Sequence, residues 1–295
     1  MTEKIRRNSG RLIWLWFILL AILFTRPLIT RMGSEIAGEV GDNIYFIWMI
    51  GWVKKALFKL GADPMNVWFL NYPEGWNMAH TEITPAQLAL AQIFAAIGSE
   101  TFAYNAVMLL SFVLSGVIMF GWVRHLTGSA AAGLLSGTIF ACLPYRQAHF
   151  LIGHLNLSGT QWLPLFFWGW FDLLRRKPEE RNRKSAVNGR AALMAAVGLG
   201  LTALTSQYYF FMMVIVAGFQ DGAGSSARKI ERSVFSEILW LVYSLFPAFA
   251  DPRGAAFPEA GRFRRDARPG MAGSSYVFRR TDRLSAAGDH AFPAG

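Results

Sequence analysis

The stretch 102-FAYNAVMLLSFVLSGVIMFGWV-123 contains no Asp, Glu, Lys or Arg. A helix needs about 20 mostly apolar residues to cross the roughly 30 Å hydrocarbon layer of a bilayer. This stretch meets that length, and the whole chain is 53% hydrophobic and only 16% charged. A soluble domain carries roughly 25% charged residues. The sequence therefore predicts an all-α membrane protein.

Further apolar runs lie on both sides of this stretch: Leu12–Ile29, Ser129–Leu143, Leu157–Leu174 and Ala191–Gly218. The last run is too long for one helix, and we expect it to divide at the polar pair Ser206-Gln207. Ser129–Leu143 is short, but its Ala and Gly residues allow neighbouring membrane helices to approach closely. These runs predict a polytopic transmembrane helical bundle with about five to seven spans.

The segment Ala86–Ile97 decides how the spans are oriented. It is apolar but only about a dozen residues long, which is short for a crossing. If it crossed, the basic run Arg175–Arg190 would lie outside, whereas cytoplasmic loops are normally the basic ones. If it lies in the interface, that run and Arg124 both face the cytoplasm. We therefore place the N-terminus in the cytoplasm and the loop Thr30–Thr101 outside, with interfacial helices in that loop.

The formal net charge of +10 comes from basic residues that flank the apolar runs. This placement suits lipid headgroups, and no helix-turn-helix, zinc-knuckle or aromatic RNA-binding motif accompanies it. We therefore expect membrane lipid and no nucleic acid as a partner. The single cysteine, Cys142, excludes an internal disulfide and a cysteine-based zinc site.

The composition changes after Gln220. We predict a membrane region over residues 1–220 and an atypical tail over 221–295, with one apolar helix at 234–250. The end of the tail is rich in Gly, Ala, Pro and Arg, which predicts disorder. Two explanations stay open: a reading frame lost near Gln220, which would leave a truncated protein, and a natural cytoplasmic tail.

Asp42 opens a predicted amphipathic helix, Asp42–Leu60, just outside the first span. A carboxylate there can act as a general base on an acceptor hydroxyl or help to bind a divalent cation. The alternative is a helix N-cap. On the same helix we expect Trp52 in the interface, with Lys54 and Lys55 facing headgroups or lipid phosphates.

The same outer loop carries two smaller groups of candidates. Tyr72 and Glu74 lie in a Pro/Gly turn, where an aromatic face beside a carboxylate suits sugar binding. His80 and Glu82 follow and can contact a metal or a phosphate. A simple interfacial or solvated loop is the alternative for both groups.

A second polar cluster lies at the outer edge of the membrane: Arg146, His149, His154 and Asn156. An arginine near the centre of a bilayer costs roughly 2.5–3.5 kcal/mol, so these groups should face a cavity, water or a phosphate. The planar guanidinium of Arg146 fits phosphate oxygens, and snorkelling to headgroups is its alternative. Gln207 and Tyr208 interrupt an apolar run on the same side, where they line a cavity or pack between helices.

Several short motifs occur in a characteristic order: Gly41-Asp42, Tyr72-Pro73-Glu74-Gly75, Pro144-Tyr145-Arg146 and Gly153-His154-Leu155-Asn156. Together with one span before a large acidic outer loop, they resemble the glycosyltransferase C superfamily, and more closely its uncharacterised bacterial multi-span members. The superfamily includes protein O-mannosyltransferases and lipid A aminoarabinose transferases. The resemblance covers roughly residues 10–219, and it implies a multi-pass protein of the bacterial inner membrane.

The resemblance also implies an activity. A sugar would pass from a polyprenyl-phosphate donor to an acceptor on the outer face, with Asp42 as catalytic base or metal ligand and a divalent cation as the only cofactor in question. Arg146 would hold the donor phosphate, with Lys54 and Lys55 behind it. The chain loses its membrane pattern after Phe219, whereas members of the superfamily usually have more spans. Two rivals therefore stay open: a carrier or flippase for a lipid-linked sugar, and an inactive truncated membrane protein.

Overall fold

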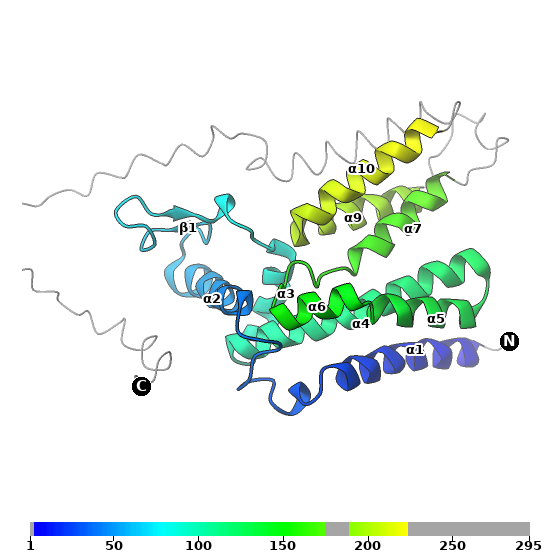
Figure 1. Cartoon of the computed structure of the whole chain (residues 1–295), viewed down its shortest axis with the longest axis horizontal. Coiled ribbons are helices and arrows are strands. Elements are labelled where there is room, and N and C mark those ends of the chain that lie inside the picture. Colours follow the sequence, from blue (N-terminus) through cyan, green and yellow to red (C-terminus); the bar gives the residue numbers. More distant parts are fainter. Residues whose placement is uncertain (1–2, 175–188, 224–295) are drawn as a thin grey trace, which may run out of the picture. The chain divides into compact units, whose positions relative to one another are not determined.

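The computed structural model describes residues 3–174 and 189–223, which all belong to one compact unit (Figure 1). The predicted tail, its apolar helix at 234–250 and most of the basic run 175–190 lie outside the described residues. The described part is mostly helical, with only two short strands, as the apolar runs predicted.

Six helices correspond to the predicted apolar runs: α1 (Glu3–Phe24), α4 (Glu100–Thr127), α5 (Ala130–Ala141), α7 (Trp162–Leu174), α9 (Gly189–Thr205) and α10 (Gln207–Ala223). In Figure 1, α1, α4 and α5 run along the long axis of the view, and α7 and α10 run obliquely to it. Helix α4 packs against α1, α5 and α7, and α9 packs between α7 and α10. The predicted break at Ser206 is confirmed, because Ser206 separates α9 from α10.

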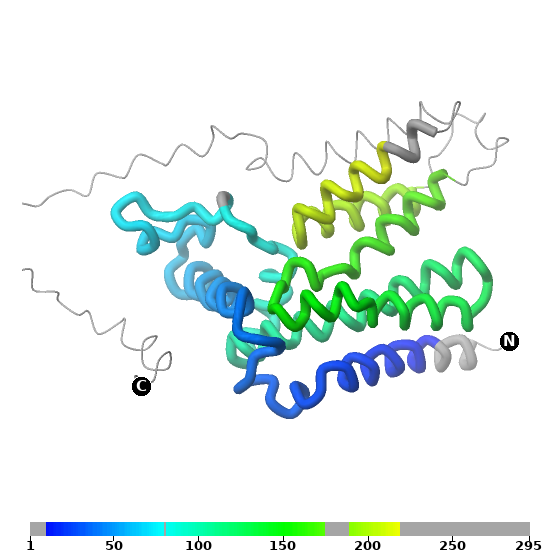
Figure 2. The backbone as a smooth tube through the Cα atoms, viewed as in Figure 1, coloured from blue at the N-terminus to red at the C-terminus, as the bar shows by residue number. Residues whose placement is uncertain are grey.

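The long loop after α1 folds into short elements: η1 (Leu28–Thr30), α2 (Asp42–Lys55), a π turn η2 (Ala56–Leu60), β1 (Asn66–Val67), β2 (Trp76–Asn77), η3 (Met78–His80) and α3 (Pro85–Ala95). The two strands form an antiparallel hairpin. Figure 2 shows this loop at the end of the helices opposite to the N-terminus. The predicted helix Asp42–Leu60 is confirmed as α2 followed by the π turn, and Gly61 ends it in a left-handed conformation with φ 59°.

Helix α4 is long and apolar enough to cross a membrane, with a mean hydropathy of 2.3, and it is the only described helix that is. Four other apolar helical stretches are shorter, at 10–17 residues. One of them is α3, whose 11 residues make a helix about 16 Å long, about half of a bilayer core. This length agrees with the predicted interfacial placement of the segment, which stays a prediction.

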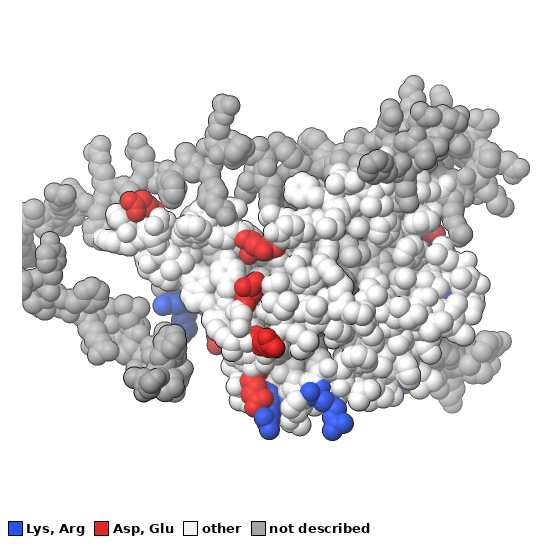
Figure 3. Space-filling model, in the orientation of Figure 1, with Lys and Arg blue, Asp and Glu red and all other residues white. Residues whose placement is uncertain are grey.

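Charged side chains lie mainly at the two ends of the helices. Helix α4 begins with Glu100 and has Arg124 in its last turn. On the face shown in Figure 3, acidic residues form a band, and most of the rest of the described surface is uncharged. This distribution is that of a protein with an apolar middle and polar ends.

Trp52 corrects one prediction about α2. Its side chain is only 3% exposed, and its indole N–H donates to the Pro64 carbonyl oxygen at 2.7 Å. It belongs to the apolar core that α2 forms with α3 and α4, and not to an interfacial face. The ring also meets Trp68 and Phe69 edge-on, so its burial holds α2 against the segment that follows it.

Helix α6 (Pro144–Ile152) follows α5 and carries Arg146 and His149, two residues of the predicted polar cluster. Pro144 stands at its first turn, where the missing N–H costs nothing. Gly153 ends it with φ 90°, and a Cβ at Gly153 would lie 2.8 Å from the Asn43 backbone nitrogen. Glycine therefore allows the end of α6 to lie directly against the start of α2.

Candidate functional site

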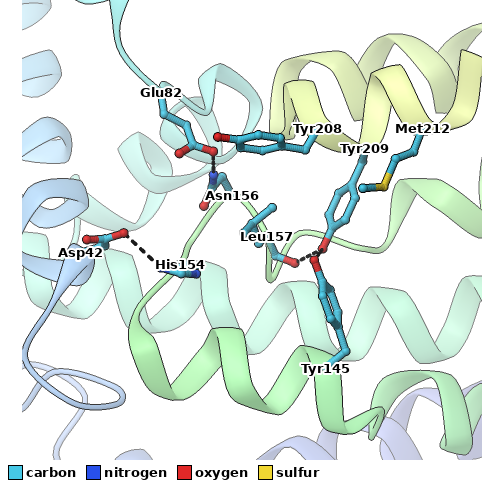
Figure 4. A pocket seen from close by; sticks show the side chains of 9 residues that line it. All are labelled: Asp42, Glu82, Tyr145, His154, Asn156, Leu157, Tyr208, Tyr209 and Met212. Carbon is cyan, nitrogen blue, oxygen red and sulfur yellow. Dashed lines mark hydrogen bonds and ion pairs between the residues drawn. The ribbon is translucent and has the colours of Figure 1, made fainter.

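A pocket of about 330 Å³ lies where the starts of α2 and α10 meet the loop before α3 and the segment around α6 (Figure 4). Its volume falls in the range of small-molecule sites. Its lining comprises Asp42, Glu82, Tyr145, His154, Asn156, Leu157, Tyr208, Tyr209 and Met212. Five of the predicted site residues are brought together here: Asp42, Glu82, His154, Asn156 and Tyr208.

Asp42 is held by the local geometry at the start of α2. The N-cap of α2 is Gly41, and the Asn43 side-chain oxygen accepts from the backbone N–H groups of Gly41 and Ile44. The N-cap alternative for Asp42 is therefore wrong. Its carboxylate instead pairs with His154, with Oδ2 3.1 Å from Nε2, while the side chain stays 64% exposed.

Glu82 is the second carboxylate of the pocket. It accepts a hydrogen bond from the side-chain nitrogen of Asn156, a residue that follows α6 in the chain. Burial raises the pKa of Glu82, the nearby His154 opposes this, and the Asp42 charge raises the pKa of Glu82 further. Two carboxylates that influence each other thus face the same cavity, an arrangement that often marks a functional site.

His149 lies behind His154, away from the pocket lining. The two Nδ1 atoms are 2.7 Å apart, and the rings are tilted with centroids 4.9 Å apart. The edge of the Tyr145 ring meets the His149 ring at 4.4 Å between centroids. Burial lowers the pKa of His149, and the His154 charge adds to this effect.

The other wall of the pocket is aromatic and apolar. The Tyr209 hydroxyl donates to the Leu157 carbonyl oxygen at 2.6 Å and lies 3.3 Å from the Tyr145 hydroxyl. Sequence reasoning did not select Tyr145, Leu157, Tyr209 or Met212. The signals for the two tyrosines were present, because Tyr145 adjoins Arg146 and Tyr209 adjoins the break at Ser206.

Arg146 does not line the pocket. Its side chain is 2% exposed, and its Nε donates to the Ser158 carbonyl oxygen at 3.2 Å. Its Nη1 lies 3.4 Å from the Ala141 carbonyl oxygen, and its guanidinium lies over the Phe112 ring, 4.9 Å from the centroid. These contacts occupy the group that was expected to hold a phosphate.

The remaining predicted residues also lie outside the pocket lining. Lys54 pairs with Glu100 at 3.2 Å, and Lys55 is half-buried on the same turn of α2. Tyr72 is 84% exposed on the hairpin, and Glu74 is exposed beside it. Gln207 is partly buried at the start of α10, and the His80 side chain lies outside what the structure describes.

The charge of the pocket is acidic. No Lys or Arg is among its described lining residues. Within residues 3–174 and 189–223, no group of three or more His, Cys, Asp or Glu side chains is arranged to hold a metal ion. Any phosphate bound here would meet Asn156 and the Tyr145 and Tyr208 hydroxyls as its hydrogen-bond donors, since both ring nitrogens of His154 contact other side chains.

The fold is similar to that of the archaeal oligosaccharyltransferase AglB from Archaeoglobus fulgidus, solved in complex with an inhibitory peptide and a dolichol-phosphate. The TM-score is 0.60 at 14% identity, over 82% of this chain and 30% of that one. The apo form of the oligosaccharyltransferase from the same organism gives the same score and identity, over 80% and 29%. This chain thus spans under a third of the length of these proteins.

At this identity the likeness shows the fold alone. No curated protein matches the chain. A family model described as "Domain of unknown function (DUF6311)" matches residues 46–250 and therefore extends past Gln220. Because that match covers more than half of the sequence, the chain belongs to this family.

Proposed function

We propose that the chain is a membrane glycosyltransferase that moves a sugar from a polyprenyl-phosphate donor to an acceptor on the outer face of the membrane. The observation that supports this most directly is the pocket shared by Asp42 and Glu82 beside an aromatic wall. The fold supports it too, because the similar AglB structure contains a dolichol-phosphate, which is a lipid-linked phosphate.

The proposed reaction needs one base. Asp42 takes the proton of the acceptor hydroxyl as the acceptor oxygen forms its bond to the anomeric carbon. The bond between that carbon and the phosphate oxygen breaks, and its electron pair leaves with the phosphate. Asp42 suits this role because its carboxylate is exposed to the pocket on one side and fixed by His154 on the other.

The donor phosphate needs different ligands from those that the sequence predicted. Arg146 is buried and Lys54 is paired with Glu100, so we assign the phosphate to donors of the pocket itself. We also propose a divalent cation for this place, since Mg²⁺ commonly takes one or two carboxylates together with substrate phosphate oxygens. Asp42 and Glu82 are the residues that would hold it, and it would neutralise charge on the leaving phosphate.

The membrane placement supports an outer-face reaction. Helix α4 can cross a bilayer, Tyr104 near its Glu100 end bonds to Gly153 beside the pocket, and Arg124 lies at its other end. Cytoplasmic ends are normally the basic ones. The pocket is therefore proposed to open outside, in a multi-pass protein with a cytoplasmic N-terminus.

The test uses the purified full chain in liposomes with a polyprenyl-phosphate carrying a radiolabelled sugar and a hydroxyl acceptor. A transferase produces labelled acceptor and free lipid phosphate. Movement of the intact donor without cleavage would instead indicate a flippase, and neither result would indicate an inactive protein. Asp42→Asn should lower turnover by about 100-fold or more while the protein stays folded. Glu39→Gln is the matched control, because Glu39 is an exposed carboxylate of the same loop outside the pocket lining.

A further inference from the structure

Three side chains, those of Asp42, His154 and His149, form a row that begins at the pocket. Asp42 Oδ2 is 3.1 Å from His154 Nε2, and His154 Nδ1 is 2.7 Å from His149 Nδ1. Both nitrogens of His154 are therefore engaged, one by a carboxylate and one by a second imidazole. The row joins α2 to α6 and the turn that follows α6.

The proton positions in this row are coupled. A carboxylate can only accept a hydrogen bond, so the contact with Asp42 requires a proton on His154 Nε2. A neutral His154 then has a lone pair on Nδ1, and the 2.7 Å contact requires His149 to donate from its own Nδ1. The opposite tautomer of neutral His154 would place two acceptors 3.1 Å apart at Asp42.

The backbone holds His149 beside His154. Its carbonyl oxygen accepts from the backbone N–H of both Gly153 and His154, at 3.1 and 2.9 Å. Gly153, at φ 90°, folds the chain back so that His154 lies beside His149. The Tyr145 ring packs one helical turn earlier and restricts rotation of the His149 ring.

We propose that His149 is a positioning residue that locks the tautomer of His154, and that His154 in turn holds Asp42 as an oriented carboxylate. This tautomer lock adds detail to the proposed function. Its expected effect on turnover rests on that function, whereas the position of the His154 proton does not. The ionisable groups facing the two imidazoles are Asp42 from α2, Glu82 from the loop before α3 and Tyr145 from α6. None of the three donates a hydrogen bond to His154 Nδ1 in place of the Nδ1–H of His149.

Two variants of His149 separate the donor from the ring. An Asn side chain places its amide N–H close to the position of an imidazole Nδ1, so His149→Asn keeps the donor. His149→Leu removes the donor and keeps comparable bulk. Loss of a group that orients a functional histidine typically lowers activity by about 10- to 100-fold. His149→Leu should lower kcat by that amount with KM for the donor unchanged, and His149→Asn should restore most of the loss.

The tautomer itself is measured by ¹⁵N NMR of histidine side chains in the full chain in detergent. The chain has five histidines, so single His→Gln variants can assign the spectrum. The wild type should show His154 with its proton on Nε2, as should His149→Asn, whereas His149→Leu should show a mixture of tautomers. A wild-type proton on His154 Nδ1, or an unchanged His154 spectrum in His149→Leu, would overturn the lock.

The spectrum is independent of turnover. If the wild type transfers no sugar under any donor, the proposed function fails while the NMR result still decides whether the lock exists. If transfer occurs and His149→Asn loses as much kcat as His149→Leu, the donor role of His149 is wrong.

Discussion

Asn156 donates its side-chain N–H to the carboxylate of Glu82, although the two residues come from segments on opposite sides of α4 in the sequence. The Asn156 side chain is almost fully buried, at 2% exposure. A hydrogen bond to a carboxylate favours its ionised form. This contact therefore partly offsets the rise in the pKa of Glu82 that burial causes.

The first prediction concerns the acidic side of the pH–rate profile. Asn156→Leu removes the donor, so the pKa of Glu82 should rise further. If the reaction needs ionised Glu82, the pH of half-maximal activity on the acidic side should move upward, since a hydrogen bond to a carboxylate favours its ionised form. Turnover measured from pH 4 to 8 in the liposome assay checks this.

Asn66→Ala serves as the control for that experiment. Asn66 lies on the exposed hairpin and bonds to Asp63 and Asn77, away from the pocket. Its profile should match that of the wild type. An upward shift in Asn66→Ala, or no shift in Asn156→Leu, would contradict the role given to the Asn156–Glu82 contact.

The second prediction concerns stability and has the opposite sign from activity. A carboxyl whose pKa is raised in the folded state binds its proton more tightly when folded, so its stabilising contribution is complete below the unfolded value of 4.5. That contribution is lost as the pH rises through the folded pKa. Glu82→Gln resembles the protonated form at all pH values. Its thermal unfolding temperature should therefore match that of the wild type at low pH and exceed it at pH 7, while turnover falls.

Scanning calorimetry or fluorescence-detected unfolding in detergent at pH 4 and pH 7 measures this difference. Glu74→Gln is the control, because Glu74 is exposed on the hairpin. It should leave both temperatures unchanged. A Glu82→Gln variant that is less stable than the wild type at pH 7 would show that the ionised form stabilises the fold.

The helices themselves could be predicted well from the sequence, because their ends are set by local chemistry. Pro85 and Pro144 start α3 and α6, Gly153 ends α6, and Ser206 divides the last apolar run. Long apolar stretches without charges leave little choice but helix when the chain must satisfy its own backbone hydrogen bonds in a membrane. The positions of the basic loops also predicted that the pocket residues lie on the same side of the membrane. In the structure Asp42, Glu82, His154 and Asn156 line one pocket.

Side-chain direction on α6 could not be predicted from composition. Arg146 was expected to face a phosphate because a charged group near a membrane edge normally seeks water. In the structure Arg146 and Phe150 share the buried face, and Tyr145 and His149 share the face near the pocket. The four-residue spacing of each pair is that of a helix, but only the neighbouring helices determine which face is buried.

The third prediction follows from the buried position of Arg146. Arg146→Ala removes two hydrogen bonds to backbone carbonyls and the contact with Phe112, and it leaves a cavity. The free energy of unfolding should fall by about 3 kcal/mol or more. Lys54→Met removes a partly exposed ion pair with Glu100 and should cost less than about 1 kcal/mol.

The same pair of variants separates a structural from a substrate role. At a temperature where Arg146→Ala is still folded, its KM for the lipid-linked donor should equal that of the wild type. A large rise in that KM together with unchanged stability would show that Arg146 binds the donor phosphate, as the sequence predicted.

The last prediction concerns two glycines of α9 that differ only in their surroundings. A Cβ at Gly198 would lie 2.5 Å from the Phe166 backbone nitrogen and 2.7 Å from its Cα, both of which are parts of α7 that cannot rotate away. A Cβ at Gly200 would meet nothing within 4 Å. Gly198→Ala should therefore separate α7 from α9 and lower the free energy of unfolding by about 1–3 kcal/mol. Gly200→Ala should raise it by about 0.5–1 kcal/mol, because alanine is the better helix former. Unfolding of both variants in the same detergent measures the difference, and an equal effect at both positions would mean that α7 and α9 are not in close contact.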